Sequence, residues 1–258
     1  MEEMFNMAPM VSIVGSRKFT SYGSQAAHVL ARELASAGIT IVSGMAIGID
    51  SVAHRSTLDK QGQTVAVLGN SLDDAHIYPR VNFNLSREIM DSGALVSDYP
   101  IATSASEFTF PARNRIIAGL SLGTLVVEAG EKSGALITAE LALEFNREVF
   151  AVPGSIFSQQ SAGTIALLKK GAKPVTGIKD ILEELNLNEV RKNPPVKNYH
   201  CEKPEEKTLL NLLSSDPVHI DNLVKLSKMG TADVASTLAI MEIKGWTKNI
   251  GGQNYIKI

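Results

Sequence analysis

Short runs of hydrophobic residues recur along the first part of the chain, each entered from a glycine or a turn and followed by helical spacing. The runs are continuous and do not alternate with polar positions, which is typical of strands buried on both faces of a parallel sheet. Alternating strands and helices imply right-handed crossovers and helices on both sides of the sheet. We therefore predict an α/β fold with an extended Rossmann-like, doubly wound, mostly parallel sheet. The predicted strands are residues 10–15, 39–44, 64–69, 94–99, 124–129 and 149–154.

Two of the intervening segments have a clear helical pattern. Residues 24–38 place apolar side chains at intervals of three and four, and Gly38 supplies a C-terminal cap. Residues 133–146 repeat the scheme. The buried face predicted for the first of these helices consists of Ala27, Leu30, Ala31 and Leu34.

The character of the sequence changes after Leu185. Residues 186–204 contain three prolines and four asparagines without a sustained period, which indicates a linker. Residues 205–258 return to helical spacing, with three short helices and then two short strands around a Gly-Gly pair, as in a winged helix-turn-helix. We predict a Rossmann-like domain over residues 1–185 and a winged-helix domain over 205–258. The apolar residues that mark its three helices are Leu209, Leu210 and Leu213, then Ile220, Leu223 and Leu226, and then Val234, Leu238, Met241 and Ile243.

Composition restricts the location and the partners of the protein. The net charge of −2 gives no overall field that would attract nucleic acid or membrane, so any such binding needs a local patch. The single cysteine, Cys201, excludes an internal disulfide and a cysteine-rich zinc site. The N-terminus carries acids where a signal peptide needs bases, and no apolar run approaches the ~20 residues of a membrane span. We expect a cytoplasmic protein that does not bind membranes.

The sequence FPARNRIIAGLS, which begins at Phe110, concentrates unusual chemistry in a few residues. Pro111 suits the first turn of a helix, where its missing N–H costs least. Arg113, Asn114 and Arg115 would then stand near the positive end of that helix. Because like charges are unfavourable there, an anion is expected to offset them, and a phosphate is the obvious candidate.

The loops that follow the predicted strands are rich in glycine and serine. In doubly wound sheets, ligands bind beyond the carboxyl ends of the strands, where such residues let backbone amides approach closely. The chain has neither GxGxxG nor GxxxxGK[ST], so a dinucleotide dehydrogenase and a P-loop ATPase are unsupported. An ordinary turn or helix cap remains the alternative at each of these positions. The candidate contacts in these loops are Gly15, Ser16, Arg17, Gly44, Gly48, Ser133, Gly134 and Thr138.

Two other groups of polar residues have weaker patterns. Asp50 and His54 are four residues apart, so they share a helix face and can form a hydrogen bond. A catalytic pair is conceivable, but no nucleophile is fixed beside them, and a structural brace is the preferred interpretation. Asp73, Asp74 and His76 share a loop but lack the spacing of a metal site. We predict no catalytic residue, no metal and no cofactor.

Taken in order, these segments resemble the DNA-processing protein A family (DprA/Smf). That resemblance implies a homodimer without enzymatic activity, which binds single-stranded DNA over the strand ends and helps to load the RecA recombinase. The chain begins close to its first strand, so the helical N-terminal domain of many members is not expected in it. The matching motifs are GSRxxTxYG at 15–23, SGxAxGID at 43–50, AVLG at 66–69, YP at 78–79, FPARNRIIAGLS at 110–121, VVEAxxxSGALIT at 126–138, VFAVPG at 149–154 and GTxxLLKKGA at 163–172.

The resemblance also assigns roles to individual positions. Phe110 would be a platform on which a base stacks, and the neighbouring arginines Arg113 and Arg115 would contact phosphates, as in other single-strand binders. Lys169, Lys170 and Lys173 are candidates for extending the groove, with a solvated helix end as the alternative. One departure from this picture is Glu107, an acid where a base would serve a DNA groove better.

Two other functions compete with this one. Glu128 after a strand and the helix opening at Ser133 are loosely similar to nucleoside-monophosphate phosphoribohydrolases, but the PGGxGTxxE motif of those enzymes is missing. The winged helix suggests a transcription regulator. Its predicted recognition helix carries Lys244 as its single base, which is poor for reading a major groove, so a protein–protein role is at least as plausible.

Overall fold

The computed structural model describes residues 9–187, 203–213, 218–249 and 251–257. The chain divides into two compact units, residues 1–195 and 196–258, and each is described here by itself. The predicted linker, 186–204, lies outside the described residues except at its two ends.

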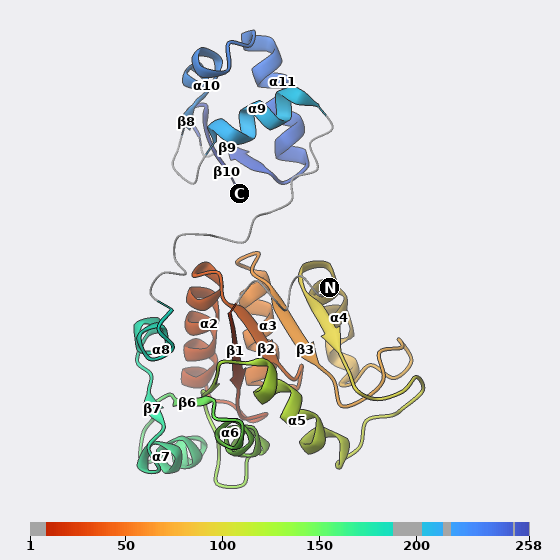
Figure 1. Cartoon of the computed structure of the whole chain (residues 1–258), viewed down its shortest axis with the longest axis vertical. Helices are drawn as coiled ribbons and strands as arrows, with labels where there is room; N and C mark the ends of the chain where they lie inside the picture. Colours follow the sequence, from red (N-terminus) through yellow and green to blue (C-terminus); the bar gives the residue numbers. More distant parts are fainter. Residues whose placement is uncertain (1–8, 188–202, 214–217, 250, 258) are drawn as a thin grey trace. The chain divides into compact units, whose positions relative to one another are not determined.

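The first unit is built on one seven-stranded sheet in which every neighbouring pair is parallel (Figure 1). Its strand order is β4-β3-β2-β1-β5-β6-β7. All six predicted strands are present, which confirms the doubly wound fold. The seventh, β7, was not predicted because a lysine and a proline form no hydrophobic run. The strands are β1 (Met10–Val14), β2 (Thr40–Ser43), β3 (Thr64–Val67), β4 (Ala94–Val96), β5 (Gly123–Val126), β6 (Glu148–Ala151) and β7 (Lys173–Pro174).

Helices cover both faces of this sheet. The helices α2, α3 and α8 share one hydrophobic cluster with the sheet, and α4 packs in a second cluster beside α3. The helices α5, α6 and α7 form a third cluster on the opposite face. The buried face predicted for α2 is confirmed, since Ala27, Leu30, Ala31 and Leu34 are all buried. The bounds are α2 (Ser21–Ser36), α3 (Ile49–Leu58), α4 (Phe83–Ser92), α5 (Thr109–Leu120), α6 (Gly134–Glu144), α7 (Ala162–Lys169) and α8 (Ile178–Glu184), with short 3-10 helices η1 (Arg80–Asn82) and η2 (Gln159–Ser161).

The strand order reverses between β1 and β5, which lie side by side at the centre of the sheet. The chain leaves β1 toward α2 on one face and leaves β5 toward α6 on the other. A crevice therefore opens where the two connections diverge, which is the usual ligand position in such sheets.

The described residues of the second unit form three helices and a three-stranded sheet of order β8-β10-β9, as predicted for a winged helix apart from the short strand β8. Two of the apolar residues that mark its helices are on the surface: Leu226 is 63% exposed and Ile243 is 88% exposed. Ile243 follows the buried Met241 by two positions, about 200° around the helix, so the two side chains point to opposite sides. The bounds are α9 (Pro204–Leu212), β8 (Val218–His219), α10 (Ile220–Ser227), α11 (Thr231–Ile243), β9 (Thr247–Asn249) and β10 (Asn254–Lys257).

Candidate nucleic-acid interface

The turn after β1 is held in place from several sides. The Ser16 backbone N–H donates to the Glu128 carbonyl at 2.7 Å, which ties the turn to the end of β5. The Ser16 hydroxyl donates to Gln160 Oε1 at 2.7 Å and accepts from the Lys18 N–H at 3.0 Å. Because its own turn is fixed in this way, Arg17 projects from a rigid support.

Gly48 lets this turn lie directly against the connection between β2 and α3. Its φ is +104°, and a Cβ at this position would come within 2.4 Å of the Ser16 carbonyl oxygen. A side chain there would therefore push the turn, and Arg17 with it, out of position. Gly48 was predicted to contact the ligand, but its visible role is to permit this close approach.

Arg113 is the buried centre of the site. Only 5% of it is exposed, and its Nη1 donates to the carbonyl of Gly44 at 2.8 Å and also to the carbonyl of Val67. Its Nε donates to Asn114 Oδ1 at 3.2 Å, and the Asn114 amide reaches the Gly134 carbonyl at 3.4 Å. That Arg113 contacts phosphate stays a prediction: it lines the cleft, but its Nη1 is engaged with backbone carbonyls at the floor of the site.

A buried carboxylate accompanies this buried cation. Asp50 accepts from the Gly44 N–H at 3.1 Å, so the Gly44 residue is held at its nitrogen by Asp50 and at its oxygen by Arg113. Burial raises the pKa of the Asp50 carboxyl, and the positive charge of Arg113 opposes that rise. Burial likewise lowers the pKa of Arg113 to about 10, against the effect of Asp50, so its guanidinium stays charged at neutral pH. Asp50 and Arg113 together hold the Gly44 backbone at the end of β2, and Arg113 also holds the Val67 carbonyl at the end of β3.

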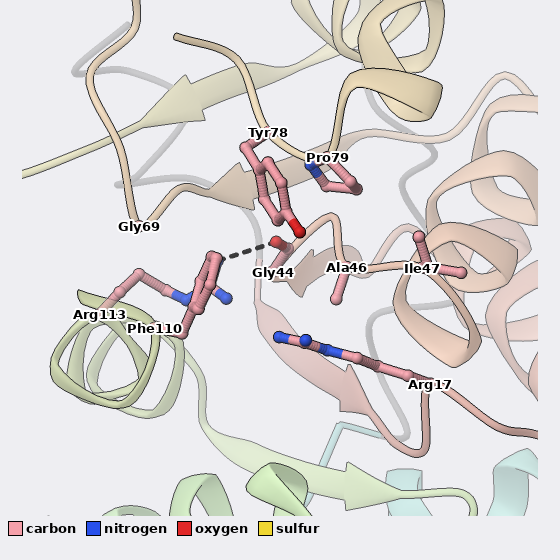
Figure 2. A pocket seen from close by; sticks show the side chains of 9 residues that line it. All are labelled: Arg17, Gly44, Ala46, Ile47, Gly69, Tyr78, Pro79, Phe110 and Arg113. Carbon is pink, nitrogen blue, oxygen red and sulfur yellow. Dashed lines mark hydrogen bonds between the residues drawn. The ribbon is translucent and has the colours of Figure 1, made fainter. Parts of the chain in front are cut away.

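Phe110 lies at the mouth of the site with its ring between Tyr78 and Arg17 (Figure 2). The Arg17 Cζ atom is 5.3 Å from the centre of the ring, and the Tyr78 ring centre is 5.6 Å from it at an angle of 37°. The Phe110 side chain is half-buried, so its ring is neither sealed in the core nor fully in water. The prediction that Pro111 stands in the first turn of its helix is confirmed, since α5 begins at Thr109.

These residues line an open cleft of about 560 Å³ above the divergence of β1 and β5. Its exposed charged side chains are Arg17, Lys18, Lys132 and Glu107. A smaller hollow continues from it between Phe110 and Tyr78, beside Ala46 and Ile47. Of the residues predicted from sequence, the cleft brings together Gly15, Ser16, Arg17, Phe110, Arg113, Asn114, Ser133, Gly134 and Thr138, and the hollow adds Gly44.

Besides Gly48, four predicted contacts lie outside the cleft and the hollow. Arg115 stands two positions after Arg113, hence on the other side of α5, where it pairs with Asp98 at 2.6 Å. Lys169 and Lys170 are exposed at the C-terminal end of α7, just before β7 begins at Lys173. Because a parallel strand begins at the edge of the sheet opposite the cleft, these lysines do not extend the groove.

The Asp50–His54 hydrogen bond that the spacing allowed is not formed. His54 is fully buried and pairs through Nδ1 with the Thr64 hydroxyl at 2.7 Å, and that hydroxyl donates to the Ile41 carbonyl at 2.8 Å. His54 Nδ1 must therefore carry the proton, and Nε2 has no hydrogen-bond partner. Burial, reinforced by the charge of Arg113, lowers the His54 pKa to about 3. The histidine is a neutral brace, as the preferred interpretation proposed.

Comparison with known proteins identifies the family. The family model described as DNA recombination-mediator protein A matches residues 2–186, and the model described as DprA winged helix domain matches residues 194–253. The chain belongs to the DNA recombination-mediator protein A family.

Members of this family from several bacteria are similar in sequence to this chain. DprA of Bacillus subtilis is 44% identical over 185 residues, which cover 72% of this chain and 62% of that protein. Protein Smf of Escherichia coli is 36% identical over 255 residues, covering 96% of this chain and 67% of that protein. The chain thus spans about two thirds of the length of these relatives.

Two solved structures of family members have a fold similar to that of this chain. DprA from Streptococcus pneumoniae is similar with a TM-score of 0.64 and 39% identity, over 70% of this chain and 62% of that one. DprA from Helicobacter pylori has a TM-score of 0.65 and 34% identity, over 72% of this chain and 83% of that one. The work on the latter describes a unique mode of binding single-stranded DNA. In the described part of the present chain, no helix is long and apolar enough to cross a membrane.

Glu128, the acid on which the enzyme alternative depends, faces away from the cleft. It is 2% exposed, and its carboxylate accepts from the Thr20 N–H at 2.8 Å and from the Thr20 hydroxyl at 2.5 Å. Thr20 caps α2, so the carboxylate offsets the positive end of that helix. Among the described residues, no group of three potential metal ligands comes together either.

Lys244, the base expected on the recognition helix, is also engaged. It forms an ion pair with the buried Glu206 at 2.8 Å and lies over the Trp246 ring at 4.8 Å. The charged side chains of α11 itself, Asp233 and Glu242, are both acidic and exposed. This helix therefore presents a poor surface to the phosphates of duplex DNA.

Sequence reasoning did not assign four residues that line the site. Lys18 follows Arg17 in the same turn and Lys132 precedes Ser133, so both could have been found from their place at a strand end. Tyr78 belongs to the YP pair among the family motifs, which gave it no role. Gln160 is not marked by any local pattern, because only the packing of η2 against β5 brings it to the cleft.

Proposed function

We propose that this protein is a recombination mediator that binds single-stranded DNA in the cleft between β1 and β5. It acts in DNA processing during natural transformation, as a cytoplasmic homodimer that hands the strand to the RecA recombinase and catalyses no reaction. The observation that carries the proposal is the position of the Arg17 guanidinium, 5.3 Å from the centre of the Phe110 ring at the mouth of an open cleft. A cation and an aromatic platform side by side are what an unpaired nucleotide requires.

The energies favour exchange of the arginine for a base. An exposed cation–π contact such as that of Arg17 with Phe110 contributes about 0.5–1 kcal/mol. A base stacked on an aromatic side chain contributes roughly 1–3 kcal/mol. The base therefore displaces the guanidinium from the ring, and the released Arg17 can turn to the adjoining phosphate. In a duplex, the bases are already stacked on one another, so this exchange selects single strands.

The cleft supplies a local positive rim in a chain of net charge −2. Arg17, Lys18 and Lys132 are exposed along it, and Glu107 partly opposes them. We expect modest affinity that falls steeply as salt rises.

The hand-over to RecA and the homodimer rest on membership of the family. The family's name, recombination-mediator protein, supports a role in loading a recombinase. The engagement of Glu128 with Thr20, outside the cleft, supports a binding role over the phosphoribohydrolase alternative. The acidic surface of α11 supports a protein-binding role for the winged helix over the transcription-regulator alternative.

The test is a titration of fluorescently labelled oligo-dT against a duplex of the same length at two salt concentrations. We expect tighter binding of the single strand, and a Phe110→Ala variant that binds more weakly with an unchanged salt dependence. Equal affinity for both forms, or wild-type affinity in Phe110→Ala, would refute the proposal. Co-sedimentation with RecA on the same oligonucleotide tests the hand-over separately.

A further inference from the structure

A second aromatic side chain stands in solvent at the edge of the sheet where the cleft opens. Phe157 is 92% exposed and its neighbour Ile156 is 79% exposed, in the segment that follows β6. The backbone beneath the ring is ordered: the Phe157 N–H donates to the Ser155 hydroxyl at 3.2 Å, and the Ser158 N–H donates to the Ser155 carbonyl at 3.0 Å. An exposed ring on a fixed turn is well suited to a contact with a flat ligand, because little freedom is lost on binding.

Gln160 connects this turn to the cleft. Its side chain lines the cleft and accepts from the Ser16 hydroxyl at 2.7 Å, and its backbone carbonyl accepts from the Ala129 N–H at 2.8 Å. The preceding residue lies against the next loop, since a Cβ on Gly130 would be 3.6 Å from the Gln159 carbonyl. The segment that carries Phe157 therefore reaches the rim of the cleft at Gln160, while Ser155 and Ser158 line a neighbouring hollow.

Phe110 and this rim lie at opposite ends of the cleft. The Phe110 ring packs over Gly69, just beyond β3, where a Cβ would be 3.0 Å from its Cδ1. Phe157 follows β6, and the order β3-β2-β1-β5-β6 separates the two strands by four spacings. At about 4.8 Å per spacing, strands β3 and β6 are roughly 19 Å apart. Single-strand sites of about 4–16 nucleotides reach across such a distance.

The charges between the two rings suit a phosphate backbone. Lys18 follows β1 and Lys132 follows β5, so both lie between the strand ends that Phe110 and Phe157 mark. Both lysines are exposed and line the cleft. Glu107 is also exposed in the cleft lining, but it is close to Phe110 in sequence.

We propose that Phe157 is a second stacking platform, on which a base of a longer single strand packs after the strand has crossed Lys18 and Lys132. This inference rests on the proposed function, and it sets the polynucleotide length that the protein binds best. The strand is held at two rings, Phe110 and Phe157, with its phosphates on the basic rim between them.

The experiment compares oligo-dT of about 4 nucleotides, enough for the Phe110 end alone, with a series up to about 16 nucleotides. For the wild-type chain, affinity should rise in a step once the strand is long enough to reach Phe157. Phe157→Ala should bind the shortest oligonucleotide like wild type and lose that step, so that it binds the longest about 5- to 150-fold more weakly. Phe157→Trp should keep the step, and Phe157→Leu, which is apolar but cannot stack as a ring, should lose it.

The control is Phe145→Ala. Phe145 is 43% exposed at the C-terminal end of α6, a helix that begins at the cleft and runs away from it. Its removal should therefore change the affinity neither for short nor for long oligo-dT. Lys132→Ala should reduce the magnitude of the salt slope by about 0.7 for the long oligonucleotide, the value for one phosphate contact on a single strand.

The possible results distinguish a failure of this inference from a failure of the proposed function. Failure of wild type to bind any oligo-dT would refute the proposed function itself. A wild-type length series unchanged in Phe157→Ala would overturn the second platform while leaving the Phe110 site intact. Sedimentation velocity provides the last check: a wild-type dimer that becomes a monomer in Phe157→Ala would assign this ring to contact between copies of the chain and overturn the inference.

Discussion

The guanidinium of Arg113 occupies the space that a side chain on Gly44 would need. A Cβ built on Gly44 would stand 2.6 Å from Nη2 and 2.8 Å from Cζ of Arg113, while Nη1 donates to the Gly44 carbonyl at 2.8 Å. Glycine at 44 and arginine at 113 are thus a matched pair, although 69 positions separate them.

Gly44→Ala tests this pairing. The added methyl group meets a buried guanidinium whose Nη1 is held by two carbonyls, so we expect a loss of about 1–3 kcal/mol in the free energy of unfolding, measured by urea denaturation. Combination with Arg113→Lys should cost less than the sum of the two changes, because both disturb one contact. Gly134→Ala is the control: nothing lies within 4 Å of its Cβ position, so its stability should match or exceed that of wild type.

Arg17→Ala and Arg115→Ala form a matched pair of charge removals. Arg17 lines the cleft, so its loss should weaken oligo-dT binding and reduce the magnitude of the salt slope by about 0.7. Arg115 pairs with Asp98 on the outer side of α5, so its loss should leave affinity unchanged and cost at most about 1 kcal/mol of stability. Fluorescence anisotropy at several salt concentrations measures both. Equal effects of the two substitutions would contradict the location of the binding site.

Glu128→Gln distinguishes a brace from a catalytic acid. The variant keeps a hydrogen-bonding oxygen for Thr20 but removes the charge that offsets the start of α2, so we expect a loss of roughly 0.3–2 kcal/mol in stability. Because this carboxylate does not line the cleft, oligo-dT affinity should stay within roughly twofold of wild type. An abolished release of free base from a nucleotide in this variant would instead favour the enzyme.

His54 should make the protein less stable in acid. Its pKa is about 3 in the folded chain, against 6.5 for an ordinary histidine, so the unfolded chain binds the additional proton between these values. The stability from the neutral ring is present above pH 6.5 and is lost as the pH falls toward 3, at up to about 1.4 kcal/mol per pH unit. Urea denaturation from about pH 7 to about pH 5 measures this slope.

His54→Asn keeps a donor toward Thr64 but cannot titrate. Its stability should vary less with pH than that of wild type, while Asp50 and the other titrating groups contribute equally to both proteins. Identical slopes would show that the histidine is not held neutral.

The sequence alone determined the alternation of strands and helices, and with it the edge of the sheet at which a ligand binds. Continuous apolar runs need burial on both faces, and that requirement is local enough to be seen in the residues themselves. It also placed Gly15, Ser16, Arg17 and Phe110 near one another, since residues at the carboxyl ends of neighbouring strands must share an edge.

Only the tertiary structure decided what each charged side chain does. Arg113 and Arg115 look equivalent in the sequence, yet the turn of α5 directs the first into the carbonyl ends of β2 and β3 and the second toward Asp98. Gln160 reaches Ser16 across 144 positions, a contact that no local pattern encodes. Burial and partners depend on which segments meet in space, so packing alone settled that Arg113 lies at the floor of the cleft and Arg115 outside it.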